Sequence, residues 1–327
     1  MTKLGNITEK RLTFSSGPMH FNFRTAVISG ACRSGKTTLG NILGTCSNVE
    51  NSEEPWTAKL LPLVTSLGLV NDVVGREMFL TYVTELYNEI IFLRRANFRP
   101  ADLSCIWAQK DHEEVYERLT RLNSRLDVKK YTKKNNPLLL LNLTEVVPFL
   151  QFILDTMPDV KFINVIRNGK NVASDCLDKH WYSDEQLQSP VKALPYQEYI
   201  HKNKVWYIPW WVNIGDEDLF ISYSEYDRCI YYWCQTVESG HEVIGKMIKK
   251  GNCLNVNYSN LIEKTTETIE LVTNFMGVET TPKTEYAIAK LKLRSKNINS
   301  NIITNKALIN RYFNTESKVF DERHYHI

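Results

Sequence analysis

A glycine-rich loop at residues 30–37 has the residue types and the spacing of a phosphate-binding site. It reads Gly-x-x-x-x-Gly-Lys-Thr, it follows the apolar pair Val27 and Ile28, and residues 39–43 after it have helical spacing. A strand, a glycine loop and a helix in this order aim backbone N–H groups and the positive end of the helix at one point, where an anionic phosphate is held. The sequence therefore predicts phosphate binding at this loop.

A second group of cations follows another apolar stretch. Residues 160–166 read Val-Lys-Phe-Ile-Asn-Val-Ile, and Arg167 and Lys170 come directly after them at the start of a helical pattern. The N-terminus of a helix attracts anions, and an arginine can make two parallel hydrogen bonds to a phosphate. Two anion sites on neighbouring strands favour a ligand with two separated anionic groups. The alternative interpretation is a positively charged helix start on the surface.

The predicted strands around these loops do not end in a carboxylate. Enzymes that transfer phosphoryl groups commonly hold Mg²⁺ with the loop Ser/Thr and an Asp at the end of a second strand. The candidate strand ends lie at 142–144, 166–167 and 257–258, and none of these positions is acidic. We therefore expect no metal in the site. A kinase of a small molecule or nucleotide that uses ATP and Mg²⁺ is the alternative, favoured by the intact Gly-Lys-Thr at 35–37.

Short apolar strands alternate with longer helical patterns along the chain. After the strand at Val27 and Ile28, the next strands are predicted at 138–143, 160–166 and 253–258. Helical patterns cover roughly 76–95, 112–127, 145–156, 169–180, 222–249 and 264–276. The continuous apolar run at 138–141 is typical of a parallel sheet that is buried on both faces. The sequence therefore predicts an α/β three-layer sandwich with a central parallel sheet.

No internal repeat or low-complexity linker interrupts the 327 residues, so a single domain over 1–327 is predicted. Its least regular part, about 183–220, carries Pro190, Pro195 and Pro209 and is predicted to be an insertion or lid. Aromatic side chains crowd this region: Trp181, Tyr182, Tyr196, Tyr199, Trp206, Tyr207, Trp210 and Trp211. They could line the site of a second substrate or fasten the segment to the core, and both interpretations stay open.

Composition excludes several classes of protein. The net charge of +3 is too small to indicate nucleic-acid binding. No apolar run approaches the ~20 residues that cross a bilayer, and residues 1–6 contain no apolar secretory core. The seven cysteines are odd in number and form no Cys-x-x-Cys pair, which favours reduced thiols. We therefore expect a cytoplasmic protein, and the sequence does not indicate its oligomeric state.

The motifs and their order resemble the sulfotransferases that use 3′-phosphoadenosine 5′-phosphosulfate (PAPS), and the style is closest to bacterial and tyrosylprotein-type members. The resemblance rests on the Arg-Ser-Gly at 33–35, the segment 157–163, the Val-Ile-Arg-Asn-Gly-Lys-Asn-Val-Ala-Ser at 165–174, and the strand and tyrosine turn at 254–261. It covers most of the chain. It implies transfer of a sulfuryl group from PAPS to a hydroxyl acceptor, a small molecule or a glycan, with 3′,5′-ADP as the product and no metal requirement.

The resemblance also implies roles for individual residues. The 5′-phosphosulfate would be bound by Arg33, Ser34, Gly35, Lys36, Thr37 and Thr38. Arg167 and Ser174 would bind the 3′-phosphate, and Tyr258 would belong to the same cofactor site. Ser174 stands one residue before the usual serine position of the family, which Asp175 occupies here. Arg33 and Lys36 would also be catalytic, because they could stabilise the charge that builds on the departing phosphate.

A general base must accept the proton of the acceptor hydroxyl. In the related enzymes a glutamate follows the Arg-Ser-Gly at a similar distance, which makes Glu54 the first candidate and Glu53 the second. His112 and His180 are the histidine alternatives. The competing interpretation of the two acids is a solvated loop. A third hypothesis, besides the transferase and the kinase, is a nucleotide-binding protein without catalytic activity.

Overall fold

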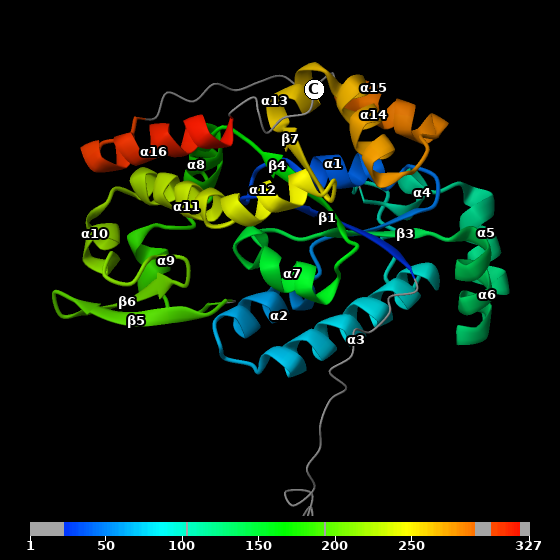
Figure 1. Cartoon of the computed structure of the whole chain (residues 1–327), viewed down its shortest axis with the longest axis horizontal. Coiled ribbons are helices and arrows are strands. Elements are labelled where there is room, and N and C mark those ends of the chain that lie inside the picture. Colours follow the sequence, from blue (N-terminus) through cyan, green and yellow to red (C-terminus); the bar gives the residue numbers. More distant parts are fainter. Residues whose placement is uncertain (1–22, 103, 193, 292–301, 321–327) are drawn as a thin grey trace, which may run out of the picture.

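A five-stranded parallel sheet lies at the centre of the computed structural model, which describes residues 23–102, 104–192, 194–291 and 302–320 (Figure 1). The strand order is β2-β3-β1-β4-β7. The bounds are Arg24–Ser29 (β1), Val49–Ser52 (β2), Leu138–Asn142 (β3), Lys161–Ile166 (β4) and Cys253–Asn257 (β7). Val27 of β1 pairs with Leu141 on one side and with Phe162 on the other. Strands β2 and β3 lie on one side of β1, and β4 and β7 lie on the other. At such a point the carboxyl ends of the strands border a crevice of the kind in which α/β proteins bind ligands.

Helices cover both faces of this sheet. Their bounds are Lys36–Leu43 (α1), Trp56–Ser66 (α2), Asp72–Ile91 (α3), Leu150–Thr156 (α7), His241–Lys249 (α12), Tyr258–Glu263 (α13), Thr265–Met276 (α14) and Pro282–Leu291 (α15). Ala26 and Ile28 face a core shared with α1, α14 and α15, whereas Val27 faces a second core with α2, α3 and α7. This alternation on a strand buried from both sides produces the predicted three-layer α/β sandwich.

A third apolar core lies beside the sheet, under α8 (Gly169–Leu177), α11 (Glu225–Ser239) and α16 (Lys306–Val319) (Figure 1). It contains Tyr231, Tyr232 and Trp233, which are all buried. The core positions α8, the helix that carries the second predicted anion site. Its N-cap, Asn168, accepts hydrogen bonds from two backbone N–H groups of the first turn.

The segment predicted to be irregular, 183–220, consists largely of regular elements. It contains α9 (Asp184–Gln188), an antiparallel hairpin of β5 (Tyr196–His201) and β6 (Lys204–Pro209), and α10 (Glu217–Ser222). The prolines that suggested irregularity stand where elements begin or end, as Pro195 precedes β5 and Pro209 closes β6. Trp206 and Trp211 are buried in the third core, so these two side chains fasten the segment to the body of the protein.

Two predicted helices are each divided in the structure. The pattern at 112–127 forms α5 (His112–Arg121) and α6 (Arg125–Asn135), because Ser124 begins a new helix with a capping box. The pattern at 222–249 is interrupted at Gly240, where a Cβ would lie 2.2 Å from Val147. The remaining elements are α4 (Ile106–Gln109) and the 3₁₀ turn Val147–Phe149.

Strand β2 and helix α2 were not predicted from the sequence, whereas α1 is implied by the phosphate loop.

In the part of the chain that the structure describes, no helix is long and apolar enough to cross a membrane. Residues 1–6, on which the expected lack of a secretory core depends, lie outside that part.

Candidate active site

The predicted phosphate loop connects β1 to α1 at the carboxyl edge of the sheet. Gly35 caps α1 with a positive φ of 99°, and a Cβ at this position would lie 2.3 Å from the Tyr258 ring. A residue with a side chain is therefore excluded at position 35, both by the backbone φ and by collision with the Tyr258 ring. The Arg167 guanidinium lies 4.8 Å from the centroid of the same tyrosine ring. Tyr258 thus brings the first and the second predicted anion sites together.

A cavity of about 650 Å³, called the main cavity below, opens at this edge of the sheet. Most of the predicted site residues line it: Arg33, Gly35, Lys36, Thr37, Thr38, Glu54, Arg167 and Tyr258. Ser34 does not point into it, because its hydroxyl is buried behind the loop near Gly30. Any contact of Ser34 with a 5′-phosphosulfate would therefore come from its backbone N–H rather than from its hydroxyl.

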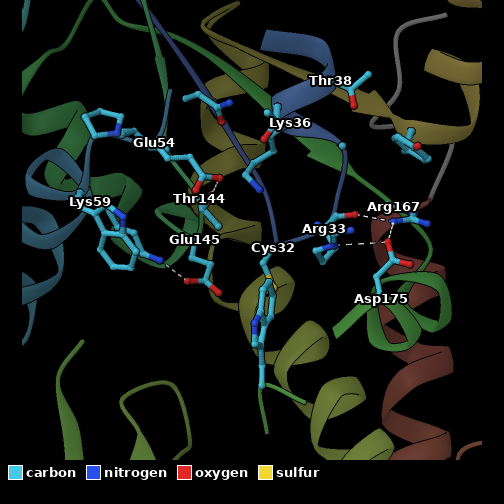
Figure 2. Close-up of a pocket in the computed structure, with 18 of the residues that line it drawn as sticks. Cys32, Arg33, Lys36, Thr38, Glu54, Lys59, Thr144, Glu145, Arg167 and Asp175 are labelled. Carbon is cyan, nitrogen blue, oxygen red and sulfur yellow. Dashed lines mark hydrogen bonds and ion pairs between the residues drawn. The ribbon is translucent and has the colours of Figure 1, made fainter. Parts of the chain in front are cut away.

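Lys36 lines the main cavity on the side of the phosphate loop (Figure 2). Its side chain is held against the loop, where Nζ donates a hydrogen bond of 3.1 Å to the Ala31 carbonyl oxygen, and the residue is 3% exposed. Burial lowers the pKa of Lys36, and the nearby carboxylates of Glu54 and Glu145 oppose this effect. An anionic ligand on the loop would stabilise the charged form of this amine further.

Beside the loop lies a buried ion pair that the sequence analysis did not identify. Lys59 Nζ is 2.6 Å from Glu145 Oε2, and both residues line the main cavity. The Tyr232 hydroxyl donates to Glu145 Oε1 and accepts a hydrogen bond of 2.8 Å from the Cys32 backbone N–H. Burial alone would raise the pKa of Glu145, but Lys59 above all and Tyr232 hold it below its ordinary value. The cavity therefore contains a second fixed cation next to Lys36.

This pair was not predicted, because Glu145 does not stand directly at the end of a strand. Glu145 lies three residues beyond the last residue of β3. Its backbone N–H donates to the Gly30 carbonyl oxygen at 3.1 Å, so the turn after β3 is attached to the phosphate loop. Lys59 comes from α2, which was not predicted, so the sequence offered no signal that would connect it with Glu145.

Glu54, the first candidate for the base, lies on the same side of the loop. Its Oε1 accepts a hydrogen bond of 2.7 Å from the Thr144 hydroxyl, and the residue is exposed to the cavity. Figure 2 shows this pair beside Lys59 and Glu145. We call these four residues the carboxylate end of the main cavity.

The other candidates for the base lie elsewhere in the described structure. Glu53 is exposed and faces a different cavity. His112 packs against Trp107, with ring centroids 5.1 Å apart. The His180 side chain is 73% exposed and lies 3.4 Å from a Glu225 oxygen. None of these three described residues lines the main cavity, so the geometry favours Glu54.

A second cavity of about 460 Å³, called the side cavity below, adjoins the first. The two cavities share Glu54, Pro55 and Trp56, which therefore form the boundary between them. The side cavity is bordered by apolar, aromatic and polar side chains that include Leu86, Ile90, Tyr82, Arg95, Asn97 and Ser104. Its place beyond the end of β2 puts both cavities along one edge of the sheet.

The opposite side of the main cavity, called the arginine end, contains Arg33, Arg167 and Asp175. Arg167 Nη1 lies 2.6 Å from Asp175 Oδ2 and donates a hydrogen bond of 2.7 Å to the Arg33 carbonyl oxygen. Arg33 Nε is 3.7 Å from the same carboxylate oxygen (Figure 2). Arg167 of the second predicted anion site therefore faces the main cavity, whereas Lys170 does not line it, and a carboxylate of the protein contacts both Arg167 and Arg33.

Ser174 does not take part in this site. It is 1% exposed and lies against Tyr226 in the third core, whereas Asp175 faces the cavity. Successive residues of a helix differ by about 100° in direction, so the one-residue offset turns the serine inward and the carboxylate outward. The prediction that Ser174 contacts a 3′-phosphate is therefore wrong.

The residues present fit a nucleotide anion better at the loop than at the arginine end. At the loop, backbone N–H groups at the start of α1 and the amine of Lys36 suit a phosphate. At the arginine end, Asp175 already accepts a hydrogen bond from Arg167 Nη1 and would compete with a phosphate for this donor. Within the described residues, no group of three or more His, Cys, Asp and Glu side chains is arranged to hold a metal ion.

Comparisons with known proteins were made for the whole chain. A scan against protein-family models finds no match, and a search of curated proteins finds none. The chain is similar to the solved sulfotransferase domain from the Synechococcus PCC 7002 olefin synthase, with 13% identity and a TM-score of 0.47, over 95% of this chain and 98% of that one. It is also similar to sulfotransferase STF9 from Mycobacterium avium, with 12% identity and a TM-score of 0.47, over 91% and 77% of the two chains.

A mouse sulfotransferase, SULT7A1 complexed with PAP, is similar at 10% identity and a TM-score of 0.35, over 91% of this chain and 77% of that one. The chain thus resembles sulfotransferases of known structure, at low sequence identity. This likeness concerns the fold.

Proposed function

We propose that the protein is a sulfotransferase that moves the sulfuryl group of PAPS to a hydroxyl acceptor. The observation that carries the proposal is the meeting of two cavities at Glu54, beside the phosphate loop and the amines of Lys36 and Lys59. A transfer between two substrates needs two adjoining binding sites with a proton acceptor at their boundary. Glu54 is a carboxylate at such a boundary.

The loop would hold the 5′ end of the nucleotide, which supplies an activated sulfuryl group when bound. The backbone N–H groups at the start of α1 and the side chains of Arg33, Lys36 and Thr38 border the space for this anion. Lys36 would stabilise the negative charge that develops on the leaving phosphate, because a fixed cation in a cavity of low dielectric needs little reorganisation. Lys59, held by Glu145, would add a second cation on the acceptor side.

Glu54 would accept the proton of the acceptor hydroxyl as the new oxygen–sulfur bond forms and the bond to the leaving phosphate breaks. Its hydrogen bond from Thr144 orients the carboxylate. The acceptor would occupy the side cavity. Trp56 and Tyr82 supply aromatic surfaces on which a sugar ring could pack, and the Ser104 hydroxyl could donate to it, so a carbohydrate is one acceptor that fits.

An ATP-dependent kinase is the second candidate. The intact Gly-Lys-Thr at 35–37 favours it, and Thr37 is exposed in the main cavity, where such enzymes bind Mg²⁺. Glu145, the acid beyond β3, is bound by Lys59 and Tyr232, which leaves it poorly suited as a metal ligand.

The proposal for the sulfotransferase also includes a cytoplasmic location and a single domain over 1–327.

Calorimetric titration with 3′,5′-ADP, with ATP and with ATP plus Mg²⁺ tests the assignment, together with turnover of labelled PAPS against a panel of hydroxyl acceptors. We expect metal-independent binding of 3′,5′-ADP and transfer of label to at least one acceptor. Binding of ATP that requires Mg²⁺, with no binding of 3′,5′-ADP, would instead assign a kinase. Binding of 3′,5′-ADP without transfer to any acceptor would favour the third hypothesis, a nucleotide-binding protein without activity.

A further inference from the structure

We propose that Asp175 determines the nucleotide specificity of the arginine end, because its carboxylate occupies the place that a 3′-phosphate needs. The inference rests on the proposed function, since it takes the arginine end as the site for the ribose side of the nucleotide. It assigns to a residue of α8 a role in choosing between nucleotides with and without a 3′-phosphate.

The geometry places Asp175 between the two arginines (Figure 2). A single oxygen, Oδ2, lies 2.6 Å from Arg167 Nη1 and 3.7 Å from Arg33 Nε. The carboxylate thus makes the charge-assisted contacts that a phosphate oxygen would make with the same donors. The structure therefore contains an internal anion at this site.

The charges show what a 3′-phosphate would encounter. Arg33 and Arg167 contribute two positive charges and Asp175 one negative charge, so this end of the cavity has one net positive charge. A phosphate monoester carries about −1.5 to −2 at neutral pH. With Asp175 in place, the phosphate would meet a like charge at contact distance, which opposes its attraction to the arginines. Binding of a 3′-phosphate is then an exchange of one anion for another.

Asp175 is the partner that can move in this exchange. Arg167 is held by the Arg33 carbonyl oxygen and by the Tyr258 ring, and its side chain is 18% exposed. The side chain of Asp175 is 28% exposed and lies on the cavity side of α8. The neighbouring Ser174 is buried in the third core and cannot replace the carboxylate as a neutral ligand.

A nucleotide with a free 3′-hydroxyl would meet a different environment. A hydroxyl can donate a hydrogen bond to the Asp175 carboxylate without separating it from Arg167. The wild-type protein should therefore prefer 3′,5′-ADP over 5′-AMP by a smaller factor than a protein with the same arginines and no acid. Asp175 thus reduces the difference in affinity between 3′,5′-ADP and 5′-AMP.

Titration calorimetry with 3′,5′-ADP and 5′-AMP tests this on the full chain. For Asp175→Asn, which removes the charge and keeps the size, we expect 3′,5′-ADP to bind about 10-fold more tightly, equal to about 1.4 kcal/mol. The affinity for 5′-AMP should stay the same or fall. Asp178→Asn is the matched control, because Asp178 is an exposed acid at the end of the same helix, and both affinities should stay unchanged.

A double-mutant cycle assigns the effect to the arginine contact. In an Arg167→Ala background, Asp175→Asn should favour 3′,5′-ADP over 5′-AMP by a smaller factor, because only the direct repulsion and the longer contact with Arg33 remain. Equal gains for both nucleotides, a gain that is as large without Arg167 as with it, or no gain at all would overturn the inference. If the wild type binds 3′,5′-ADP and transfers sulfuryl groups while Asp175→Asn changes nothing, only the inference fails. If neither form binds 3′,5′-ADP and both bind ATP with Mg²⁺, the proposed function fails and the inference fails with it.

Discussion

The two ends of the main cavity differ in how firmly their charged side chains are held. At the carboxylate end, Lys59 and Glu145 are largely buried, and Tyr232 and the Cys32 N–H extend their contact into a chain of hydrogen bonds. At the arginine end, Arg33 is 44% exposed and Asp175 28% exposed. Buried charges that lose their partner are strongly destabilised, whereas exposed pairs are screened by water and contribute little.

This difference suggests a division of tasks. The charges at the carboxylate end are preorganised by the fold, which suits groups that must act on the reacting atoms without rearrangement. The contacts at the arginine end can be exchanged for those of a ligand, which suits the choice between nucleotides. The following changes would break or sharpen this contrast.

Glu54→Gln should have the largest effect. The amide keeps the size of the side chain but cannot accept the acceptor proton, so kcat should fall by about 10²–10⁴-fold. Binding of 3′,5′-ADP, measured by calorimetry, should stay near that of the wild type. Glu285→Gln, at an exposed acid of α15 that lines neither cavity, is the control and should retain activity. Normal turnover by Glu54→Gln would place the base elsewhere.

Lys36→Met should come next. It removes a buried cation from the loop while roughly keeping its volume, and kcat should fall by about 10²–10³-fold, the span for loss of one preorganised charge stabiliser. The affinities for 3′,5′-ADP and 5′-AMP should both fall, because both ligands carry the 5′-phosphate. Lys179→Met, at an exposed lysine after α8, should leave both measurements unchanged. Unequal losses for the two ligands would argue against the 5′ assignment of the loop.

Glu145→Gln should lower the free energy of unfolding by about 3 kcal/mol at pH 7, because Lys59 loses its buried partner. The pKa of Glu145 is depressed in the folded protein, so the stabilisation is fully present above the ordinary glutamate pKa of about 4.3. It is lost as the pH falls through the lower folded pKa. Urea unfolding of wild type and variant from pH 7 to pH 3 should therefore show a difference that shrinks in acid.

The control for that experiment is Glu242→Gln, which removes the exposed pair between Glu242 and Lys246. Such surface pairs contribute about 0–1 kcal/mol. A loss for Glu145→Gln no larger than that of the control would show that the carboxylate end is not firmly held, and the contrast between the two ends would disappear.

Arg167→Ala should have the smallest effect of the four. The affinity for 3′,5′-ADP should fall about 10-fold, near the lower limit for a hydrogen bond to a charged group, because Asp175 already competes for the arginine. The affinity for 5′-AMP should change little, and titration of both ligands measures the difference. Equal losses of affinity for the two nucleotides would mean that the arginine end does not bind the 3′-phosphate.

Much of the fold could be predicted from local patterns. The strands predicted at 138–143, 160–166 and 253–258 appear as β3, β4 and β7. The continuous apolar run at 138–141 is typical of a strand that is buried on both faces of a parallel sheet. Strand β2 was not predicted, since Val-Glu-Asn-Ser is too short and polar to show a period. One predicted helix is divided at Gly240, where a Cβ would collide with Val147, a neighbour that local patterns do not reveal.

The candidate site divides in a similar way. The loop at 30–37 and the importance of Arg167 follow from residue types that stand next to each other in the sequence. Lys59, Glu145 and Tyr232 could not be connected from the sequence, because they come from three separate elements and meet only in the folded chain. The outward direction of Asp175 depends on the rotation of α8 against the third core, which burial of Val172, Ala173 and Cys176 sets.

The sequence by itself determined the parallel α/β architecture and the phosphate loop, since strand hydrophobicity and glycine spacing act over a few residues. Tertiary structure decided which charges face one another. The crossing of the chain from one side of β1 to the other brought the turn after β3 and the start of α8 to the same edge of the sheet. Because electrostatic contacts depend on distances between side chains far apart in sequence, the paired Asp175 and the buried Lys59 became visible only in the folded protein.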